Sequence, residues 1–288
     1  MREISTTSMP MPTIMSAFQL RTNDGFVSLV CVPLLSLGVL VATNTRQRQE
    51  HAASAVAFQG ESGASVPDSK DGEWARFLSA LGLASRPLLT VRQRHTNRCV
   101  IFEGTVQQWA SWREAPPIGD ALLTRAREVV LGVHTADCAP IFLLDVRTRA
   151  RAAIHAGWRG TLGRIVECAF RLMVEHFGTR AEDCFAAIGP TIGPCCYEVG
   201  PDVVEPFRRE FPYADALFAS PTTVGRARLD LVEANVRQLL ACSIPRAQIF
   251  TCALCTACHP QLFFSHRRDS RTQGRVGRML SVIGDLAP

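Results

Sequence analysis

Residues 132–161 read GVHTADCAPIFLLDVRTRARAAIHAGWRGT, and this stretch decides the fold. Its two apolar runs, residues 140–144 and 152–154, predict neighbouring antiparallel strands joined by a charged turn. Cys138 precedes the first run and His155 ends the second, so a thiol and an imidazole would lie at the same end of the pair. Paired strands are about 4.8 Å apart, so both side chains could reach one point.

Cys138 and His155 could serve chemistry in two ways, and the residues alone leave both open. They could bind a metal ion, or Cys138 could act as a nucleophile with His155 as its base. His95, after a predicted strand over residues 88–91, would add a third ligand. Two imidazoles and a thiolate with one open position describe a catalytic zinc site, which polarises an oxygen. An isolated His or Cys is more often structural, so spacing by itself does not join the three positions.

The composition bounds the size of the core and the class of partner. The chain has 288 residues, of which 47% are hydrophobic and 20% charged, and its net charge is +5. This is enough apolar material for one large domain or two small ones. Nearly all basic residues are arginines, which suit phosphate or carboxylate binding, although a GC-rich coding bias gives the same excess. Few aromatic residues lie among them, so we expect no nucleic-acid surface.

The eleven cysteines indicate the cellular compartment. Their number is odd, the chain is long and no secretion signal stands at its front, so a disulfide framework is disfavoured. We therefore expect reduced thiols and a cytoplasmic location.

Residues 26–42 are the most apolar stretch, and they predict two buried strands rather than a membrane span. Pro33 interrupts the stretch, which is shorter than the about 20 apolar residues that a spanning helix needs. It also starts too late and lacks the basic front of a signal peptide. We expect no membrane anchor.

The remaining pattern predicts an α/β protein with mixed sheets flanked by helices. Strands outnumber helices and alternate with them irregularly, which disfavours a doubly wound parallel sheet. We expect a loose N-terminal extension over residues 1–24 and a single domain over residues 25–288. Helices are expected over residues 74–83, 162–177, 203–211 and 229–241, and further strands over 99–102, 129–133, 184–188, 249–251, 263–264 and 279–283.

A second group of thiols follows the strand predicted at residues 249–251. Cys252-x-x-Cys255-x-x-Cys258-His259 has the close spacing of a structural zinc or iron–sulfur site. It lacks a clear second CxxC pair, and the adjacent Cys195-Cys196 pair predicts poor chelate geometry. Buried or incidental thiols are the alternative.

The C-terminal segment FFSHRRDSRTQGRVGRM is rich in arginine. Arginines beside glycines after a strand could clamp a phosphate or carboxylate, and a solvated basic face is the alternative. No dinucleotide fingerprint or P-loop is present. The arginines concerned are Arg267, Arg268, Arg271, Arg275 and Arg278.

Several segments, in order from about residue 88 to residue 284, together resemble one family. They are QRHTNRCV, DALLT, TADCAP, AIHAGWRGT, IGPTIGPCCYEVG, LDLVEANVRQL and CTACHPQLFFSHRRD…GRMLSVIG. They look like the laccase-domain purine nucleoside phosphorylases, also called multicopper polyphenol oxidases or peptidoglycan editing factors. HAGWRGT together with IGPxIGPCCYEVG is highly specific.

The resemblance implies a fold, a metal and a set of reactions. The fold is a single α/β domain with mixed sheets, of the cytotoxic necrotizing factor and YfiH type. Zinc would be held by His95 of QRHTNR, Cys138 of TADC and His155 of AIHAGW, which would also be the catalytic residues. The implied reactions are phosphorolysis of adenosine, inosine, guanosine and methylthioadenosine, and deamination of adenosine. The implied partners are therefore purine nucleosides and phosphate.

The N-terminal part departs from the family pattern. The family usually has an arginine and two glycines after its first strand, whereas here Thr45-Arg46 is followed by Gln47-Arg48-Gln49. Arg46 is the candidate phosphate contact, and Arg267 is a second candidate for substrate or phosphate. His134 could be a surface residue or touch the pocket. Asp137 could orient a ligand or relay a proton, and an N-cap or turn role is equally consistent with its position.

Three rival functions stay open. Cys138 and His155 could form a cysteine hydrolase without zinc. A copper-dependent polyphenol oxidase is disfavoured, because the chain has seven histidines and none forms an HxH pair. A non-catalytic peptidoglycan-editing or binding protein would keep the pocket without turnover. The oligomeric state does not follow from the sequence.

Overall fold

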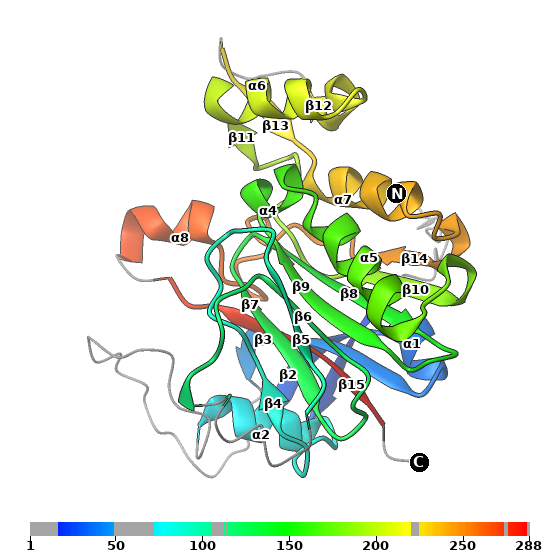
Figure 1. Cartoon of the computed structure of the whole chain (residues 1–288). Helices are drawn as coiled ribbons and strands as arrows, with labels where there is room; N and C mark the ends of the chain where they lie inside the picture. The colour runs from blue at the N-terminus through cyan, green and yellow to red at the C-terminus, as the bar shows by residue number, and fades with distance from the viewer. Residues whose placement is uncertain are drawn as a thin grey trace, which may run out of the picture.

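The computed structural model describes residues 17–48, 72–104, 112, 114–219, 225–273 and 276–286. Strands in these ranges form two six-stranded sheets and one three-stranded sheet (Figure 1). In spatial order the first sheet contains β1 (Phe18–Asn23), β2 (Phe26–Cys31), β3 (Val39–Arg48), β15 (Met279–Asp285), β7 (Val130–Thr135) and β4 (Leu88–Leu89). The second contains β14 (Ile249–Thr251), β10 (Cys184–Ile188), β8 (Ala139–Asp145), β9 (Arg151–Ala156), β6 (Ala121–Thr124) and β5 (Cys99–Phe102). The small sheet contains β11 (Glu198–Val199), β13 (Ala227–Leu229) and β12 (Phe218–Ala219).

Both large sheets are mixed, as the sequence predicts. The pairs β4–β7, β5–β6 and β10–β14 are parallel, and the other neighbouring pairs of these sheets are antiparallel. The expected α/β class is therefore confirmed, and the fold is not a doubly wound parallel sheet.

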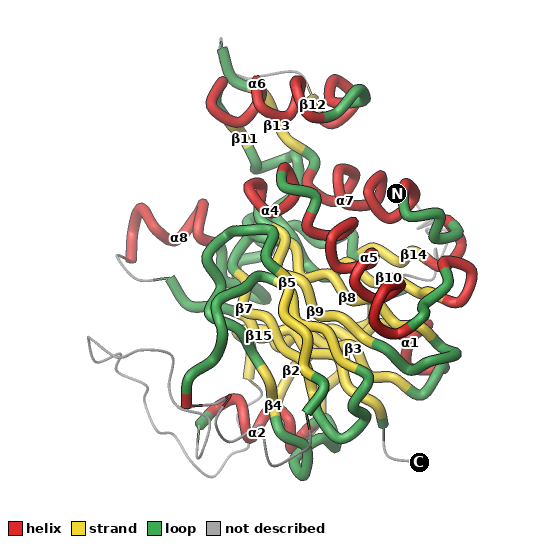
Figure 2. The backbone as a smooth tube through the Cα atoms, in the orientation of Figure 1, coloured by secondary structure: helices red, strands yellow, loops and turns green. Residues whose placement is uncertain are grey.

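Some of the helices cover the outer faces of the two large sheets, which gives four layers (Figures 1 and 2). The outer face of the first sheet packs against α2, and that of the second sheet against α5 and α7. Inward-facing residues of both sheets share the central core. The helices are α1 (Val32–Ser36), α2 (Glu73–Ala80), α4 (Trp158–Leu162), α5 (Ile165–Phe177), α6 (Pro201–Glu210), α7 (Leu231–Ala241) and α8 (His266–Gln273).

A buried ion pair joins the two large sheets. Arg151 of β9 donates to the carboxylate of Asp285 in β15, and both residues are 0% exposed. Arg149 donates to the other oxygen of the same carboxylate. A buried charge is tolerated when it is paired and hydrogen-bonded, and this carboxylate meets both conditions.

The hairpin predicted from residues 132–161 is confirmed. Strands β8 and β9 pair antiparallel with Pro140 opposite His155, so the end of β9 lies beside the start of β8. The connecting turn is closed by Asp145, whose side chain accepts the backbone N–H groups of Arg147 and Thr148 at 2.8 and 3.0 Å. Such local bonds are why aspartate favours turns.

Two predicted elements differ from the structure. Residues 162–177, predicted as one helix, are the end of α4 followed by α5, because Arg164 between them has a left-handed φ of 56°. Residues 263–264, predicted as a strand, belong to an irregular segment that leads into α8. There Ser265 Oγ accepts the backbone N–H of Arg268 at 3.2 Å, a helix-capping bond.

The N-terminal region also differs from expectation. Residues 18–23, expected to lie in a loose extension, form β1 and pair with β2. The turn between them, Asp24-Gly25, has φ values of 46° and 78°, which suits the two-residue hairpin turn that Asp-Gly favours. Residues 1–16 lie outside the described residues.

Residues 26–42 contain the two expected buried strands. The chain leaves β2, forms the short helix α1 with Pro33 in its first turn, and enters β3. Among the described residues no helix combines the length and apolar character needed to cross a membrane.

Candidate active site

His95, Cys138 and His155 converge at one end of the second sheet. One donor atom from each residue lies within 4.8 Å of the others. Cys138 immediately precedes β8, His155 lies in β9, and His95 lies between β4 and β5. Cys138 Sγ is 3.8 Å from His95 Nε2, and the two imidazole rings meet edge to face with centroids 4.8 Å apart. We call these three residues the triad.

Asp120, which precedes β6, positions both histidines of the triad. Its carboxylate accepts the backbone N–H groups of Arg94, His95 and Thr96 at 2.8 to 3.1 Å, and the Thr96 hydroxyl at 2.8 Å. It also lies 2.9 Å from His155 Nδ1. An ionised carboxylate only accepts, so Nδ1 carries a proton and donates it to Asp120, which leaves Nε2 as the ring nitrogen on the Cys138 side that could bind a metal.

No role for Asp120 follows from the residues alone, and its sequence signal is its place as the first residue of the DALLT segment. The folded chain buries its carboxylate fully, and a buried carboxylate needs several donors. Spacing along the chain does not reveal that those donors belong to the loop around His95. That contact exists only in the folded sheet.

The backbone around the triad is adapted to close packing. His95 has a left-handed φ of 59°, a conformation that the bonds to Asp120 hold in place. A Cβ atom at Gly157 would lie 2.9 Å from Cys138 Sγ and 3.1 Å from His95 Cδ2. The missing side chain at Gly157 therefore makes room for two of the three triad residues.

The electrostatics of the triad favour an ionised sulfur. Burial alone would raise the pKa of the Cys138 thiol, but the hydrogen bonds and charges of His155 and His95 lower this pKa to about 6. Burial would likewise lower the pKa of His155, but the Asp120 carboxylate and Cys138 raise it to about 9. Burial opposes ionisation of Asp120, yet bonds from His155 and Thr96 hold its pKa well below the usual range.

The donor set fits a zinc ion. Zinc binds imidazole nitrogen at about 2.0 Å and thiolate at about 2.3 Å, so neighbouring donors lie roughly 3.5 Å apart. The 3.8 Å separation of Cys138 Sγ and His95 Nε2 is close to this value. Histidines that bind zinc usually donate their other ring N–H to a carboxylate, as His155 does to Asp120. His155 is buried, whereas His95 is exposed, so the triad is open on the His95 side.

Asp137, the neighbour of Cys138, joins the triad to the C-terminal segment. Its carboxylate accepts the Thr256 hydroxyl and the backbone N–H of Arg267, both at 2.6 Å. Its φ is 86°, so it occupies a turn rather than a helix N-cap. Of the roles considered for Asp137, these contacts fit a turn role. They also hold the backbone directly before Cys138 in place.

The two arginines proposed for phosphate lie in different surroundings. The Arg46 guanidinium donates to the Pro260 carbonyl at 3.1 Å and lies over the Phe264 ring. The Arg267 guanidinium donates to the Glu198 carbonyl at 2.6 Å and lies over the Tyr197 ring. None of these contacts involves the triad. Arg267 is connected more directly to the triad, because its backbone N–H donates to Asp137, the neighbour of Cys138.

The His134 ring packs against α2. Its ring meets Trp74 of α2 edge to face, with centroids 5.6 Å apart. Burial lowers the pKa of His134 to about 4, so the ring stays neutral at physiological pH. Its backbone N–H and carbonyl both bond to the Gln93 side chain at 2.8 Å. His134 therefore links β7 to α2 and to the segment before His95.

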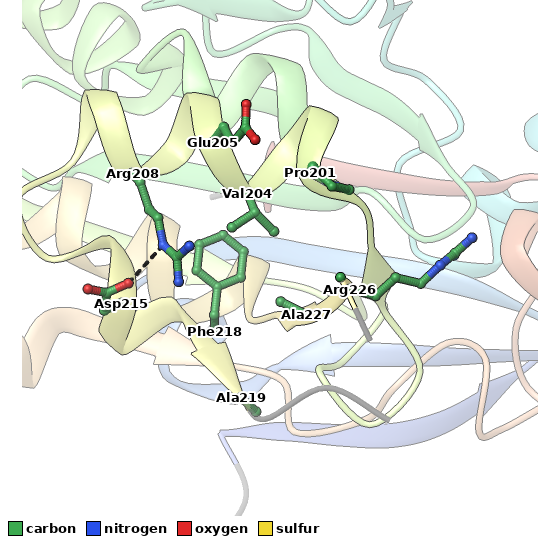
Figure 3. A pocket seen from close by; sticks show the side chains of 10 residues that line it. Pro201, Val204, Glu205, Arg208, Asp215, Phe218, Ala219, Arg226 and Ala227 are labelled. Carbon is green, nitrogen blue, oxygen red and sulfur yellow. Dashed lines mark hydrogen bonds and ion pairs between the residues drawn. The ribbon is translucent and has the colours of Figure 1, made fainter. Parts of the chain in front are cut away.

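A hollow of about 510 Å³ lies on the part of the molecule formed by α6 and the small sheet (Figure 3). Val204, Phe218 and Ala227 form its apolar lining, and Arg208 pairs with Asp215 at its rim at 2.9 Å. No triad residue lines this hollow, so it is separate from the site described above.

The fold is a four-layer mixed α/β domain. It brings two histidines and a cysteine to one end of a sheet, where they could bind a metal ion. The profile of one family, described as "Multi-copper polyphenol oxidoreductase laccase", matches residues 47–285. The chain belongs to that family.

Relatives with assigned names align to part of the chain. Purine nucleoside phosphorylase YlmD of Geobacillus stearothermophilus is 42% identical over 170 residues, 59% of this chain and 61% of that protein. Adenosine deaminase RL5 of an unknown prokaryotic organism is 38% identical over 199 residues, 68% of this chain and 75% of that protein. The chain thus aligns to about three fifths of the first relative's length and three quarters of the second's. The crystal structure of YlmD from Geobacillus stearothermophilus superposes with a TM-score of 0.76 at 29% identity, covering 94% of this chain and 100% of that one.

Proposed function

We propose that this protein is a zinc-dependent enzyme of purine nucleosides. Its reactions would be phosphorolysis of adenosine, inosine, guanosine and methylthioadenosine, and deamination of adenosine. The observation that carries the proposal is the convergence of His95, Cys138 and His155 around one point that is open on one side. The names of the aligned relatives, a purine nucleoside phosphorylase and an adenosine deaminase, supply the substrate class.

The residues of the triad would divide the work of holding the metal. Cys138 would offer its thiolate, and His155 and His95 would each offer a ring nitrogen, with the His155 ring fixed by Asp120. Binding of the ion would displace any proton from these two nitrogens. A zinc ion supplies a Lewis acid that polarises oxygen. The exposed side at His95 admits substrate, whereas buried His155 excludes water from the opposite side.

Arg267 and Arg46 remain the candidates for phosphate or substrate. Arg267 is the stronger one, because Asp137 fixes its backbone next to Cys138. Its guanidinium group would have to leave the Glu198 carbonyl to reach a ligand. A cytoplasmic location and a single domain, which includes β1 and so begins before residue 25, are part of the same proposal.

A cysteine hydrolase is the rival that a specific observation favours. The lowered pKa of Cys138 and the raised pKa of His155 describe a thiolate–imidazolium pair, which is the resting state of such a nucleophile. Metal dependence separates the two schemes. Full activity in protein that contains no zinc would rule out the zinc enzyme and support the hydrolase.

The other two rivals have less support. The family description mentions copper and polyphenol oxidation, but copper centres of that type use several histidine ligands and the triad offers two. A non-catalytic peptidoglycan-editing or binding protein would have the same pocket without turnover. Release of a purine base from inosine with phosphate, lost in Cys138→Ala, would contradict it.

The decisive experiment incubates the protein with a panel of nucleosides, with and without phosphate, and separates the products by chromatography. We expect free base and pentose phosphate with phosphate, and inosine from adenosine without it. His95→Ala, Cys138→Ala and His155→Ala should each lose zinc and activity together. His176→Ala, at an exposed histidine on α5, is the matched control and should keep both. Full activity in any triad variant would contradict that residue's assignment.

A further inference from the structure

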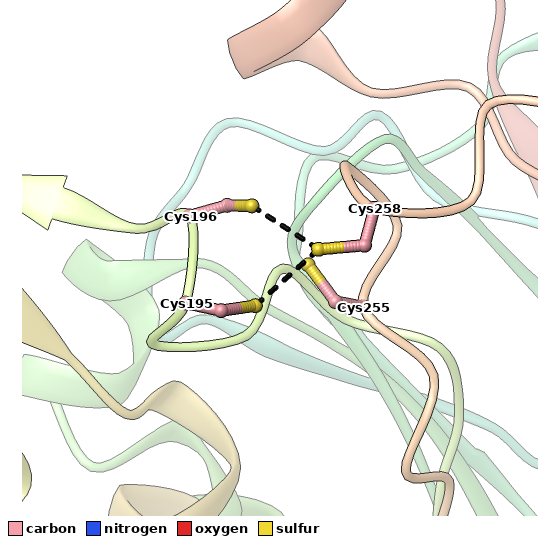
Figure 4. A group of neighbouring side chains, drawn as sticks. All are labelled: Cys195, Cys196, Cys255 and Cys258. Atoms are coloured by element: carbon pink, nitrogen blue, oxygen red, sulfur yellow. Dashed lines mark hydrogen bonds between the residues drawn. The ribbon is translucent and has the colours of Figure 1, made fainter.

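We propose that Cys195, Cys196, Cys255 and Cys258 form a second metal site, which holds one zinc ion through four thiolates. We call them the four-cysteine cluster. One donor atom from each lies within 4.8 Å of the others. Cys258 Sγ is 3.5 Å from Cys195 Sγ and 3.3 Å from Cys196 Sγ. Figure 4 shows the four side chains pointing toward one another from two separate loops.

The distances fit a single tetrahedral ion. Zinc binds thiolate at about 2.3 Å, and tetrahedral geometry then separates the sulfurs by about 3.8 Å. The measured separations are slightly shorter than this, and an ion at the centre would spread them by a few tenths of an ångström. An iron–sulfur cluster, in contrast, places cysteines on different iron atoms and therefore farther apart.

The grouping differs from the one that the sequence pattern suggested. Cys252 belongs to the core between the two large sheets, and burial raises its pKa to about 11. His259 uses Nδ1 to bond the Cys255 carbonyl at 2.9 Å. Neither belongs to the cluster. The adjacent Cys195-Cys196 pair, expected to be a poor chelate, faces Cys258 with both sulfurs.

The loop of Cys195 and Cys196 is shaped for this arrangement by Gly193. The Gly193 carbonyl accepts the backbone N–H groups of Cys196 and Tyr197, both at 3.0 Å, which makes a tight turn. The Gly193 N–H donates to Cys255 Sγ at 3.2 Å. N–H donors to sulfur favour the thiolate form, which is the form that binds metal. A Cβ atom at Gly193 would lie 3.3 Å from both Cys195 Sγ and Cys255 Cβ.

The loop of Cys255 and Cys258 is already joined to the first loop by its backbone. Cys255 forms a parallel bridge with Thr191, and Thr256 N donates to the Thr191 carbonyl at 3.2 Å. The bridge fixes the two loops side by side before any ion binds. The ion would join the two loops at a second place, at exposed Cys195 and Cys258, beyond these backbone bonds.

The position of the cluster gives it a structural role beside the triad. Thr256, next to Cys255, donates to Asp137, which precedes Cys138. Tyr197, next to Cys196, contacts the Arg267 guanidinium. A bound ion would therefore hold together the loop that carries Tyr197 and the loop that carries Thr256, the hydrogen-bond donor to Asp137. The cluster contacts no substrate in this proposal, so it does not depend on the proposed reaction.

Metal content separates the cluster from the triad. Protein purified without chelator and analysed by mass spectrometry for metals should contain two zinc ions per chain. Cys258→Ser and Cys138→Ala should each lose one of them. Cys168→Ser, at a cysteine of α5 outside both groups, is the matched control and should keep both. If the triad binds no zinc, the wild type should contain one ion, which Cys258→Ser loses and Cys138→Ala keeps.

A second measurement covers the case in which Cys258→Ser does not fold. Cobalt replaces zinc in otherwise intact Cys138→Ala, and its thiolate charge-transfer absorption should have the intensity of four sulfur ligands. Alkylation of the same native protein should spare the four cluster thiols until a chelator is added. Unchanged zinc content in folded Cys258→Ser, or iron in place of zinc, would overturn the proposal. A disulfide between Cys258 and Cys195 or Cys196 in freshly purified protein would also overturn it.

Discussion

At the scale of single residues, Asp120 does more for the candidate site than any ligand does. Its carboxylate binds the backbone on both sides of His95 and the ring of His155. Two of the three ligands are therefore oriented by one buried side chain. Substitution of such a hydrogen-bonding partner typically lowers metal affinity by about 10- to 100-fold.

We predict that Asp120→Asn lowers zinc affinity by about 10- to 100-fold. The amide has no negative charge, and its NH2 group would face backbone N–H groups that also donate. Competition with a chromophoric chelator measures the affinity. Asp215→Asn, at a carboxylate 86% exposed on the far hollow, is the control and should bind as the wild type does. Equal affinity in Asp120→Asn and the control would show that Asp120 does not position the ligands.

Gly157 is the second residue whose identity the site requires. We predict that Gly157→Ala loses most triad zinc and reduces activity at least about tenfold, since its Cβ would press on Cys138 Sγ and His95 Cδ2. Metal analysis and nucleoside turnover measure the effect. Circular dichroism should stay as in the wild type, because the contacts are with two side chains. A variant with full zinc content would mean that the ligands move aside freely.

At the scale of elements, the ion pair between β9 and β15 joins the two sheets. We predict that Asp285→Asn lowers the free energy of unfolding by about 3–5 kcal/mol, because it leaves the guanidinium of fully buried Arg151 without its counter-charge. Denaturant unfolding measures the loss. Asp183→Asn, which weakens ion pairs with Arg147 and Arg180 at the surface, should change stability little. A small effect at Asp285 would mean that water reaches Arg151 in the variant.

The elements also show what the sequence can and cannot predict. Strands β5, β10 and β14 have the predicted bounds, because short apolar runs between polar turns define them locally. Strands β11 and β12 have two residues each, and pairing with β13 defines them rather than their own composition. Helix α8 was missed because Phe263-Phe264 suggested a strand, whereas Ser265 caps a helix that begins at His266.

The same distinction applies to the sites. Cys138 and His155 are brought together by a hairpin, so local pattern predicts their proximity. His95 was a candidate third ligand from its position after a strand, but only the family motif favoured it strongly, because the bonds that place it come from Asp120, 25 positions away in the chain. The four-cysteine cluster was missed for the same reason, since its two halves lie far apart in the sequence, with Cys195 and Cys258 separated by 63 positions.

At the scale of the whole molecule, metal binding should stabilise the folded chain. We predict that a chelator lowers the thermal unfolding midpoint by several degrees, since a ligand at about 100 times its dissociation constant contributes about 2.7 kcal/mol. Differential scanning calorimetry measures the shift, and added zinc should restore the midpoint. Chelator already saturated with zinc is the control. An unchanged midpoint would mean that neither site holds a metal in the folded protein.

The bonds to the Asp120 carboxylate have a consequence for how an ion enters and leaves. Because they involve protein groups alone, the loop of His95 is ordered whether or not the centre is filled. Loading then needs little additional loss of chain entropy, and the emptied protein keeps its shape. Removal of the ion should thus be reversible by simple dialysis, without a denaturation and refolding cycle.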